Sequence, residues 1–411
     1  MRRVVVTGMG IVSPIGNSLI AVKQALLDGR SGIRAMPEWD KYEGLKCHVA
    51  GKVDGIEPRE IPRSCRRTMG RVAILAAFAV RQATELAGLN PESLDSDRVG
   101  VSMGSTTGST GSLDEFFSGY RAPGGFSNLE GTLFMKVMSH TVAANIAALT
   151  GAKGQLLAPC SACASSTQAI GLGYQAVQNG SQNIMICGGA DELHPTTIGV
   201  FDILSAASRR YNDRPDMTPR PFDRDRDGLV ISEGAGVLVL EDYEHAVNRK
   251  AKIYGEVLSY STCCNTVHMT QPSPDDMLRC MKDTLITAKC SPQDLDYVNA
   301  HATGTLMGDQ AEAEAIGRLT GEAVPVSSTK GHTGHTLAGC GAIEAIFCLL
   351  MMQDGFIAPT LNLNEVDPAC RGIAHVQQLI RCKPRIVMSN SFAFGGVNAS
   401  VILGKAPDGS H

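Results

Sequence analysis

The sequence lacks an excess of positive charge, a long uninterrupted apolar run and a linker of low complexity. A formal net charge of -4 over 411 residues offers no basic field for nucleic acid or an anionic membrane. The most apolar helical stretch, 72–89, is interrupted by Arg81, Gln82 and Glu85, so no segment is expected to span a membrane. The apolar stretch after Met1 is too short and too broken by glycine for a signal peptide. We therefore expect a globular cytoplasmic protein.

A disulfide framework is not expected either, although cysteine is plentiful. The thirteen cysteines are spread along a long chain and their number is odd, which favours reduced thiols. Cys160-Ser161-Ala162-Cys163 is the one C-x-x-C motif, and a redox dithiol and a zinc site are both open interpretations of it. Zinc usually takes four Cys or His ligands, and no second C-x-x-C is present. Redox motifs usually lie near the start of a small βαβ domain, whereas this one lies in mid-chain.

Short apolar runs that end in glycine or small polar residues recur along the chain, with helical periodicity between them. Such runs predict buried strands, and their alternation with helices predicts an α/β layered architecture. Because no linker separates domains, we expect two tightly packed halves, 1–250 and 251–411, divided near 245–265. The predicted strands are 4–6, 99–103, 184–187, 237–240, 297–300, 386–389 and 400–403.

Two motifs resemble ligand sites but are better explained as structural. Gly8-Met9-Gly10 follows a predicted strand as a dinucleotide loop would, but Ser13 stands where the third glycine belongs, so we expect a strand-turn. Residues 223–228 open like a calcium loop, which needs a glutamate six residues after its glycine. That position is Gly234, and arginines alternate with the carboxylates. We therefore expect a salt-bridged loop and no metal site.

Cys163 lies at a predicted junction between a strand and a helix. The segment 154–157 has the character of a strand end, and a helix is expected over 164–178, with Asn179-Gly180 as its stop signal. The positive end of a helix dipole lowers the pKa of a thiol, and backbone N–H groups there can receive an oxyanion. A buried structural cysteine explains this segment equally well when it is taken alone.

Histidines and one buried charge mark the second half of the sequence. His301 follows a predicted strand and precedes small and hydroxyl residues, but on its own a structural histidine is the better interpretation. His332 and His335 have H-x-x-H metal spacing, yet Lys330 would repel a cation and no further ligand lies at motif spacing. Glu344 lies within a very apolar helix and needs a partner there, which Lys330 or a backbone N–H can supply.

Five motifs occur together and in a particular order between Arg3 and about Leu403. They are Thr7-Gly8-Met9-Gly10, Ser161-Ala162-Cys163-Ala164, His301-Ala302-Thr303-Gly304-Thr305 with Gly308-Asp309, Lys330-Gly331-His332-Thr333-Gly334-His335, and Phe392-Ala393-Phe394-Gly395-Gly396-Val397-Asn398. In this combination the chain resembles the elongating β-ketoacyl-acyl-carrier-protein synthases, types I and II, of the thiolase superfamily. The resemblance implies a thiolase-like duplicated fold with five layers, α-β-α-β-α, and usually a homodimer.

The resemblance also implies a reaction, a decarboxylative Claisen condensation. Cys163 would hold the acyl group as a thioester, and malonyl-acyl carrier protein would extend it to a 3-oxoacyl-acyl carrier protein with release of CO2. His301 and His335 would donate hydrogen bonds to the malonyl thioester and stabilise the enolate. Lys330 would hold this site electrostatically. Neither a metal nor a resident cofactor is implied, since the phosphopantetheine arrives on the carrier protein.

Further residues receive roles through the same resemblance. Backbone N–H groups of Cys163 and Phe394 would form the oxyanion hole, and the Phe394 ring would be a gate beside the nucleophile. The remaining positions divide into substrate contacts, namely Thr303, Thr305, Thr270 and Phe392, and structural support from Asp309, Glu312 and Glu344.

The chain departs from the usual family pattern at several positions. Ala393 and Val397 stand where the late loop usually has Gly and Thr, Ala302 where Gly is usual, and Leu229 where Phe is common. Type I features mix with a type II-like His268-Met269-Thr270. A specialised pathway, such as aryl polyene or polyketide biosynthesis, therefore stands beside fatty acid biosynthesis as an expectation.

Two other functions remain as alternatives. A non-catalytic chain-length partner of a ketosynthase heterodimer would lack the nucleophile, whereas this chain has Cys163 and both histidines. A thiolase acting on coenzyme A esters would have a second active-site cysteine in the late loop, but 392–398 contains none.

Overall fold

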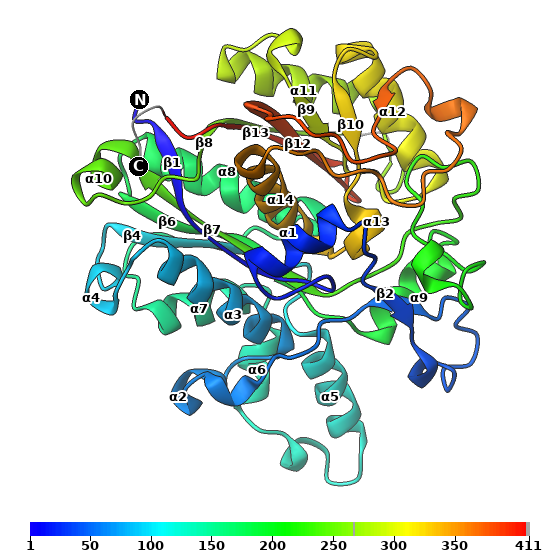
Figure 1. Ribbon diagram of the computed structural model, residues 1–411. Coiled ribbons are helices and arrows are strands. Elements are labelled where there is room, and N and C mark those ends of the chain that lie inside the picture. Colours follow the sequence, from blue (N-terminus) through cyan, green and yellow to red (C-terminus); the bar gives the residue numbers. More distant parts are fainter. Residues whose placement is uncertain (266–267, 408–411) are drawn as a thin grey trace.

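The computed structural model describes residues 1–265 and 268–407, which fold into alternating layers of helices and strands (Figure 1). One pair of helices covers the outer face of the first half of the sheet, a second pair lies in the middle, and a third covers the outer face of the second half. The pairs are α3 (Arg71–Leu86) with α7 (Thr141–Thr150), α8 (Ser165–Gln178) with α14 (Cys340–Asp354), and α11 (Pro274–Ala288) with α12 (Leu306–Thr320). This arrangement confirms the predicted thiolase-like α-β-α-β-α fold.

Eleven strands of the described residues form one hydrogen-bonded series in the order β11-β10-β9-β12-β13-β8-β1-β7-β6-β4-β5, and β2 (Ile33–Ala35) pairs separately with β3 (Val49–Gly51). The two ends of the series belong to different halves of the chain, and the halves meet where β1 pairs with β8, Val4 opposite Val257. Every predicted strand falls in this sheet. The strands are β1 (Val4–Val12), β4 (Val99–Gly104), β5 (Leu156–Leu157), β6 (Ile184–Asp191), β7 (Gly234–Asp242), β8 (Gly255–Cys264), β9 (Tyr297–Asn299), β10 (Pro325–Ser327), β11 (Ala374–His375), β12 (Ile386–Ala393) and β13 (Val397–Gly404).

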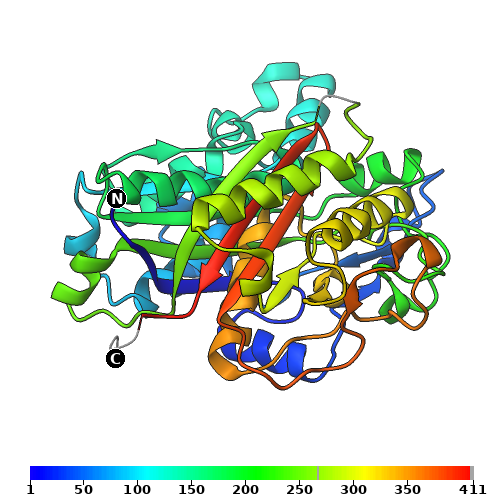
Figure 2. The same ribbon diagram turned by 90° about the horizontal axis from the view of Figure 1, so that it is seen from above.

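Figure 2 shows the second half from above, with α11 lying over β8 and β13. The strand β8 was not predicted, and it begins inside the segment in which we placed the division of the chain. It pairs with β1 on one side and β13 on the other, so it connects the two parts of the sheet. The division at residue 250 stays a prediction.

The middle layer corrects one expectation. The helical segment Leu337–Asp354 has a mean hydropathy of 1.4 and is long and apolar enough to cross a membrane, although we expected no such segment. Its composition has another cause, because 89% of this segment is buried inside the protein. A helix that lies between the two halves of the sheet is covered on all sides and is therefore apolar all round.

The glycines of Gly8-Met9-Gly10 also differ from the expected strand-turn, since β1 continues through them. A Cβ atom at Gly10 would lie 1.8 Å from the carbonyl oxygen of Ala79, and one at Gly8 would lie 2.1 Å from that of Ala83. Helix α3 thus packs directly against the backbone of β1, and only glycine leaves room for this contact.

The loop 223–228 is held by ion pairs, as predicted. Arg220 lies 3.0 Å from Asp223, and Arg226 lies 2.5 Å from Asp367 and 3.8 Å from Asp309. Arg226 thereby ties this loop to the start of α12, which carries residues beside the cavity described below.

Candidate active site

Cys163 lies in a short 3-10 turn, η4 (Ala162–Ala164), that leads directly into α8. Asn179 caps the C-terminal end of α8 and Gly180 follows with φ of +81°, so the predicted helix and its stop are confirmed. Ala162 has φ of +47°, a left-handed conformation that is costly for a residue with a side chain. This sharp turn leaves the Cys163 side chain only 7% exposed, between the layers.

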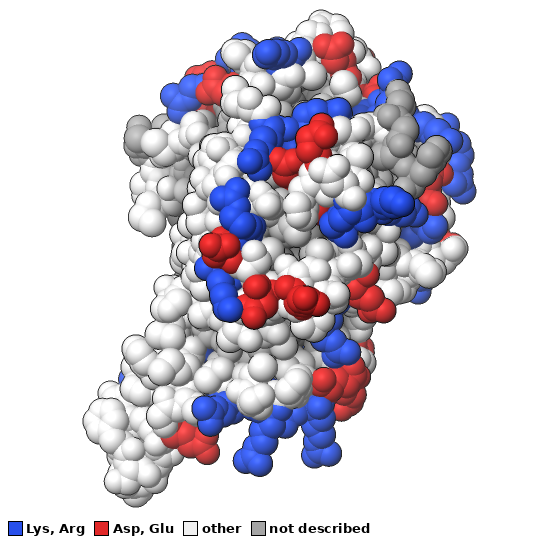
Figure 3. Space-filling model, turned by 90° about the vertical axis from the view of Figure 1, so that its left-hand side faces the viewer, with Lys and Arg blue, Asp and Glu red and all other residues white. Residues whose placement is uncertain are grey.

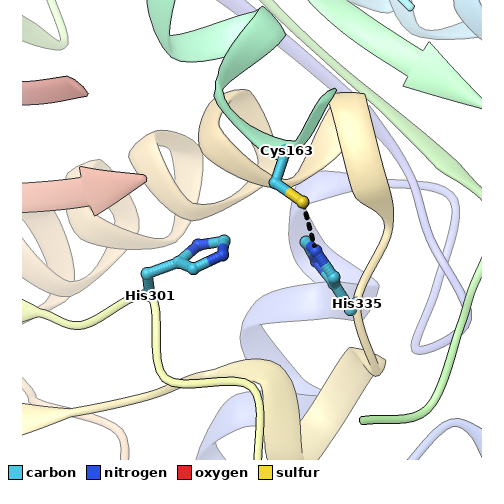
Figure 4. A group of neighbouring side chains, drawn as sticks. All are labelled: Cys163, His301 and His335. Carbon is cyan, nitrogen blue, oxygen red and sulfur yellow. Dashed lines mark hydrogen bonds between the residues drawn. The ribbon is translucent and has the colours of Figure 1, made fainter. Parts of the chain in front are cut away.

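Two histidines from distant parts of the sequence approach Cys163 from two sides (Figure 4). His335 follows α13 (Lys330–Thr333), and its Nε2 lies 2.9 Å from the Cys163 sulfur. His301 follows β9, and its ring centroid is 5.2 Å from that of His335 at an interplanar angle of 82°. All three side chains are buried. The structure therefore assembles the predicted cysteine and two histidines into one cluster.

The environment determines the protonation of these three groups. Burial, and then the nearby Lys330 ammonium, lower the pKa of His301 well below its ordinary value, and the same causes lower the pKa of His335. Both imidazoles are neutral near pH 7, so each keeps one N–H to donate and one nitrogen that can accept.

The thiol differs from the expectation. Burial raises the pKa of Cys163 to about 12, against the opposing effects of Lys330 and of the Cys163 and Phe394 backbone N–H groups. A lowered thiol pKa, expected from the helix dipole, is therefore wrong for the resting site. The helix dipole stabilises a thiolate only modestly and only within the first turn. Burial removes the thiolate from water, and this costs more free energy than the dipole supplies. The same two N–H groups are those predicted for the oxyanion hole.

Lys330 and Glu344 form a fully buried ion pair behind the histidines, so of the two partners considered for Glu344 the structure has Lys330. Burial opposes the charged ammonium, but the Glu344 carboxylate, together with Cys340 and Glu312, outweighs it and keeps the pKa of Lys330 above its ordinary value. His332, in contrast, has its two ring nitrogens 3.2 Å from the carbonyl oxygens of Arg30 and Pro359, donates to one of them, and has a structural role.

Two acidic side chains hold the loop that carries His301. Glu312 accepts a hydrogen bond from the backbone N–H of His301 at 2.8 Å. Asp309 accepts from the N–H groups of Thr303 and Gly304, at 3.0 and 3.1 Å. These contacts agree with the predicted supporting role of both acids.

Glu312 gives a testable pH dependence. Burial raises its pKa from 4.5 to about 8, so the folded protein holds a proton that the unfolded chain releases within this range. The stabilising contribution is therefore complete below pH 4.5 and is lost as the pH rises to about 8. We expect Glu312→Gln to reduce the fall in unfolding free energy over this interval, by up to about 1.4 kcal/mol per pH unit. Urea unfolding at a series of pH values measures it.

The matched control is Glu314→Gln on the same helix. Glu314 is exposed and pairs with Arg318 at the surface, at 3.4 Å. Its replacement should leave the pH dependence of unfolding unchanged. If the unfolding free energy falls equally steeply with pH in Glu312→Gln and in the unmodified protein, Glu312 does not hold this proton in the folded state.

A cavity of about 360 Å³ leads to the cluster. Cys163, His301 and His335 line it, and so do all the residues predicted to contact substrate, Thr270, Thr303, Thr305, Phe392 and Phe394. Thr303 and Thr305 share a hydroxyl hydrogen bond of 3.2 Å. Glu312 also reaches the cavity wall, whereas Lys330, Glu344 and Asp309 lie behind it.

Three neighbours of the site were not predicted. Phe201 of α9 (Pro195–Ile203) stacks on Phe394 with centroids 5.7 Å apart. The Cys340 thiol bonds the carbonyl oxygen of Cys163 at 3.3 Å, and the Asp191 carboxylate accepts from the N–H of Ala338 at 2.8 Å. No motif spacing marks these residues, because their contacts arise only when the layers pack.

Some of these side chains are of the types that bind zinc. Ligand atoms of Cys163, His301 and His335 lie within 4.8 Å of one another, as do those of His301, Cys340 and Glu344. The Lys330 ammonium beside both groups opposes a cation. Cys160, the other half of the C-x-x-C, is exposed and its thiol bonds the carbonyl oxygen of Thr106 at 3.1 Å, away from this cluster.

The layered fold, with a buried cysteine between two neutral histidines at the end of a cavity, is that of a thiolase-fold acyltransferase. The chain belongs to the β-ketoacyl synthase family. Residues 1–246 match the N-terminal domain of that family and residues 254–364 match its C-terminal domain.

Known proteins resemble the chain over nearly its whole length. It is 38% identical to 3-oxoacyl-[acyl-carrier-protein] synthase 1 of Haemophilus influenzae, over 98% of this chain and 99% of that one. A β-ketoacyl synthase structure from Burkholderia phymatum superposes with a TM-score of 0.96 at 42% identity, over 99% and 100% of the two chains. A type II polyketide ketosynthase in complex with its acyl-carrier protein has a TM-score of 0.90 at 28% identity, again over 99% and 100%.

Proposed function

We propose that this protein catalyses decarboxylative condensation of an acyl group on Cys163 with malonyl-acyl carrier protein, giving 3-oxoacyl-acyl carrier protein and CO2. The observation that carries the proposal is the convergence of Cys163, His301 and His335 at the end of one cavity. The product belongs to fatty acid biosynthesis or to a specialised polyketide or aryl polyene pathway. The panel of acyl substrates described below distinguishes these pathways.

In the first half-reaction the Cys163 sulfur attacks the acyl thioester of the first carrier protein. Because the thiol is protonated at rest, its proton must leave during the attack, and Nε2 of His335, 2.9 Å away, is placed to accept it. That proton passes to the sulfur of the departing phosphopantetheine arm. The N–H groups of Cys163 and Phe394 face the developing oxyanion, where one such donor typically contributes about 3 kcal/mol.

In the second half-reaction the malonyl thioester occupies the same cavity. Donation from His301, and from His335 in the tautomer that carries its proton on Nε2, stabilises the enolate that loss of CO2 leaves behind. The enolate carbon then attacks the acyl group on Cys163, a carbon–carbon bond forms, and the cysteine sulfur leaves as a thiolate that takes up one proton from solvent to restore the resting thiol. Neutral imidazoles in a dry site supply these donors, so the proposal requires no metal or resident cofactor.

The test uses purified protein with a panel of acyl-carrier substrates and malonyl-acyl carrier protein. Formation of a 3-oxoacyl thioester together with CO2 supports the proposal, and the preferred acyl group indicates the pathway. Release of CO2 without a new carbon–carbon bond would instead support a partner subunit of a heterodimer. Cleavage of 3-oxoacyl-coenzyme A would support a thiolase, and metal analysis of the active protein tests the zinc interpretation.

The carrier protein is proposed to dock on a basic hollow near α2 (Arg63–Arg66). Arg63, Arg67 and Lys136 line this hollow of about 580 Å³ with one carboxylate, Glu130. A mainly positive surface suits an acidic partner and chiefly accelerates the encounter. We expect Arg67→Glu to raise KM for acyl-carrier protein several-fold and to leave KM for the same acyl group on a short pantetheine thiol unchanged. Equal effects on both substrates would contradict this docking site.

A homodimer is proposed through the surface at the β5 edge of the sheet. β5 is the last strand in the series, with β4 as its one neighbour among the described strands. The adjoining projection carries α5 (Thr110–Arg121) and α6 (Thr132–Val137), and few charged side chains lie on the face of it that Figure 3 shows (Figures 1 and 3). Its exposed apolar side chains are Leu113, Phe117, Tyr120, Phe126, Phe134 and Met135. Such a patch favours association with another protein surface.

Light scattering after size-exclusion chromatography tests the dimer. The unmodified protein should have twice the mass of one chain, and Phe134→Glu should shift it toward a monomer. Ile286→Glu, at an exposed apolar position on α11, is the matched control and should remain dimeric. A monomeric unmodified protein would contradict the homodimer and direct the search to a chain-length partner. We propose a cytoplasmic location, where acyl carrier proteins and reduced thiols are available.

A further inference from the structure

A second pair of cysteines lies in the seam between β8 and α11, outside the Cys163 cluster. The Cys263 thiol of β8 bonds the carbonyl oxygen of Asp276 at 3.4 Å, and the Cys280 thiol of α11 bonds the carbonyl oxygen of Ser261 at 3.5 Å. Asp276 and Cys280 are one helical turn apart, and Ser261 and Cys263 lie on the same face of the strand. The two sulfurs therefore share one part of the seam, since each bonds a backbone carbonyl of the element that carries the other.

The pair is electrostatically asymmetric. The neighbouring Cys280 thiol, with a further contribution from Arg279, lowers the pKa of Cys263 below its ordinary value. The Cys263 sulfur and burial together raise the pKa of Cys280 well above its ordinary value. Cys263 is half-buried whereas Cys280 is buried, so a small oxidant reaches Cys263 first, and the lowered pKa of Cys263 favours loss of the proton that it donates to the Asp276 carbonyl. Thiolates that are accessible and have a second thiol beside them are those most readily oxidised.

We propose that Cys263 and Cys280 are a site of oxidation by hydroperoxides, in which Cys263 is attacked first and Cys280 closes a disulfide. The Cys263 sulfur attacks a peroxide oxygen, the O–O bond breaks, and the released alkoxide or hydroxide takes a proton. Cys263 is then a sulfenic acid. The Cys280 sulfur attacks it, the S–S bond forms, and the sulfenic oxygen leaves as water with the Cys280 proton. Two thiols are oxidised and one hydroperoxide is reduced to an alcohol, or water, plus water.

The seam lies next to the wall of the catalytic cavity. Cys263 pairs in register with Asn398 of β13, and Met277 stands on α11 one turn before Cys280. Asn398 and Met277 both line the cavity. A disulfide would therefore link the strand behind one part of the cavity wall covalently to the helix that supplies another part. This inference concerns a chemistry separate from condensation and holds whether or not the proposed function does.

The experiment treats the full-length protein with one equivalent of hydrogen peroxide, blocks remaining thiols with N-ethylmaleimide, and maps peptides by mass spectrometry without reduction. We expect a cross-linked pair of peptides joined through Cys263 and Cys280 that dithiothreitol separates. In Cys280→Ser the reaction should stop at the sulfenic acid, which dimedone traps on Cys263. Cys264→Ser is the matched control, since Cys264 is the exposed neighbour, and it should form the same disulfide.

Other outcomes would overturn the proposal. If the peroxide oxidises Cys264 or Cys163, and N-ethylmaleimide added afterwards still labels Cys263 and Cys280 as free thiols, this seam is not the reactive site. A Cys280→Ser variant in which dimedone labels Cys264 in preference to Cys263 would have the same meaning. The measurement on the unmodified protein needs no substitution, so it decides the question even if a variant fails to fold.

Discussion

Replacement of Cys163 by serine should lower the rate of condensation by roughly 10⁴- to 10⁶-fold, the range found when a residue of a covalent catalytic unit is removed. Serine keeps the size and position of the side chain but is a far weaker nucleophile. In the described part of the chain, His335 is the one side chain that hydrogen-bonds the Cys163 sulfur, at 2.9 Å. The acyl-enzyme should therefore no longer form. Mass spectrometry after exposure to acyl-carrier protein shows directly whether the acyl-enzyme is present, and the amount of 3-oxoacyl product measures turnover.

The same variant separates the two half-reactions. His301 and His335 remain, so slow release of CO2 from malonyl-acyl carrier protein should persist while carbon–carbon bond formation is lost. Cys160→Ser is the matched control, because Cys160 is the other cysteine of the motif and its thiol faces the carbonyl of Thr106. It should form the acyl-enzyme at the normal rate. Condensation by Cys163→Ser at a rate close to that of the unmodified protein would refute the nucleophile.

Much of this architecture was predictable because strand and helix signals are local. The buried apolar runs at 4–6 and 184–187 lie within β1 and β6, and the Asn179-Gly180 stop is the end of α8. The strand β8 was missed because its side chains are mixed, Gly255 and Glu256 through Cys263 and Cys264, without a continuous apolar run. Its position is fixed by pairing with β1 and β13, which lies outside any local window.

The site was predictable in its members and less so in its electrostatics. Motif order identified Cys163, His301 and His335, and the isolated charge of Glu344 in an apolar helix indicated the buried partner Lys330. The pKa of Cys163 was misjudged because the helix dipole can be read from sequence, whereas burial depends on how the layers close around the turn. The stacking of Phe201 on Phe394 depends on the same packing and has no sequence signal.

Replacement of Lys330 by methionine should destabilise the protein by about 3–5 kcal/mol, the usual cost of removing one partner of a buried ion pair. Methionine fills similar volume, so the loss is chiefly electrostatic, because Glu344 is left buried without its ammonium. Urea unfolding measures the change. The surface pair of Lys23 and Asp354, 3.0 Å apart and about one-third exposed on each side, gives the matched control. Lys23→Met should cost less than about 1 kcal/mol.

The double variant Lys330→Met with Glu344→Gln separates charge from packing. If the unpaired carboxylate causes the instability, removal of its charge should restore much of the lost free energy, as it does when buried ion pairs are replaced together. The ammonium also lowers the pKa values of His301 and His335, so its loss should move the acidic limb of the rate profile to higher pH. A double variant that is stable but keeps the original pH profile would show that Lys330 serves only to hold the fold together. A stable double variant with a shifted profile would show instead that the buried ammonium keeps both histidines neutral.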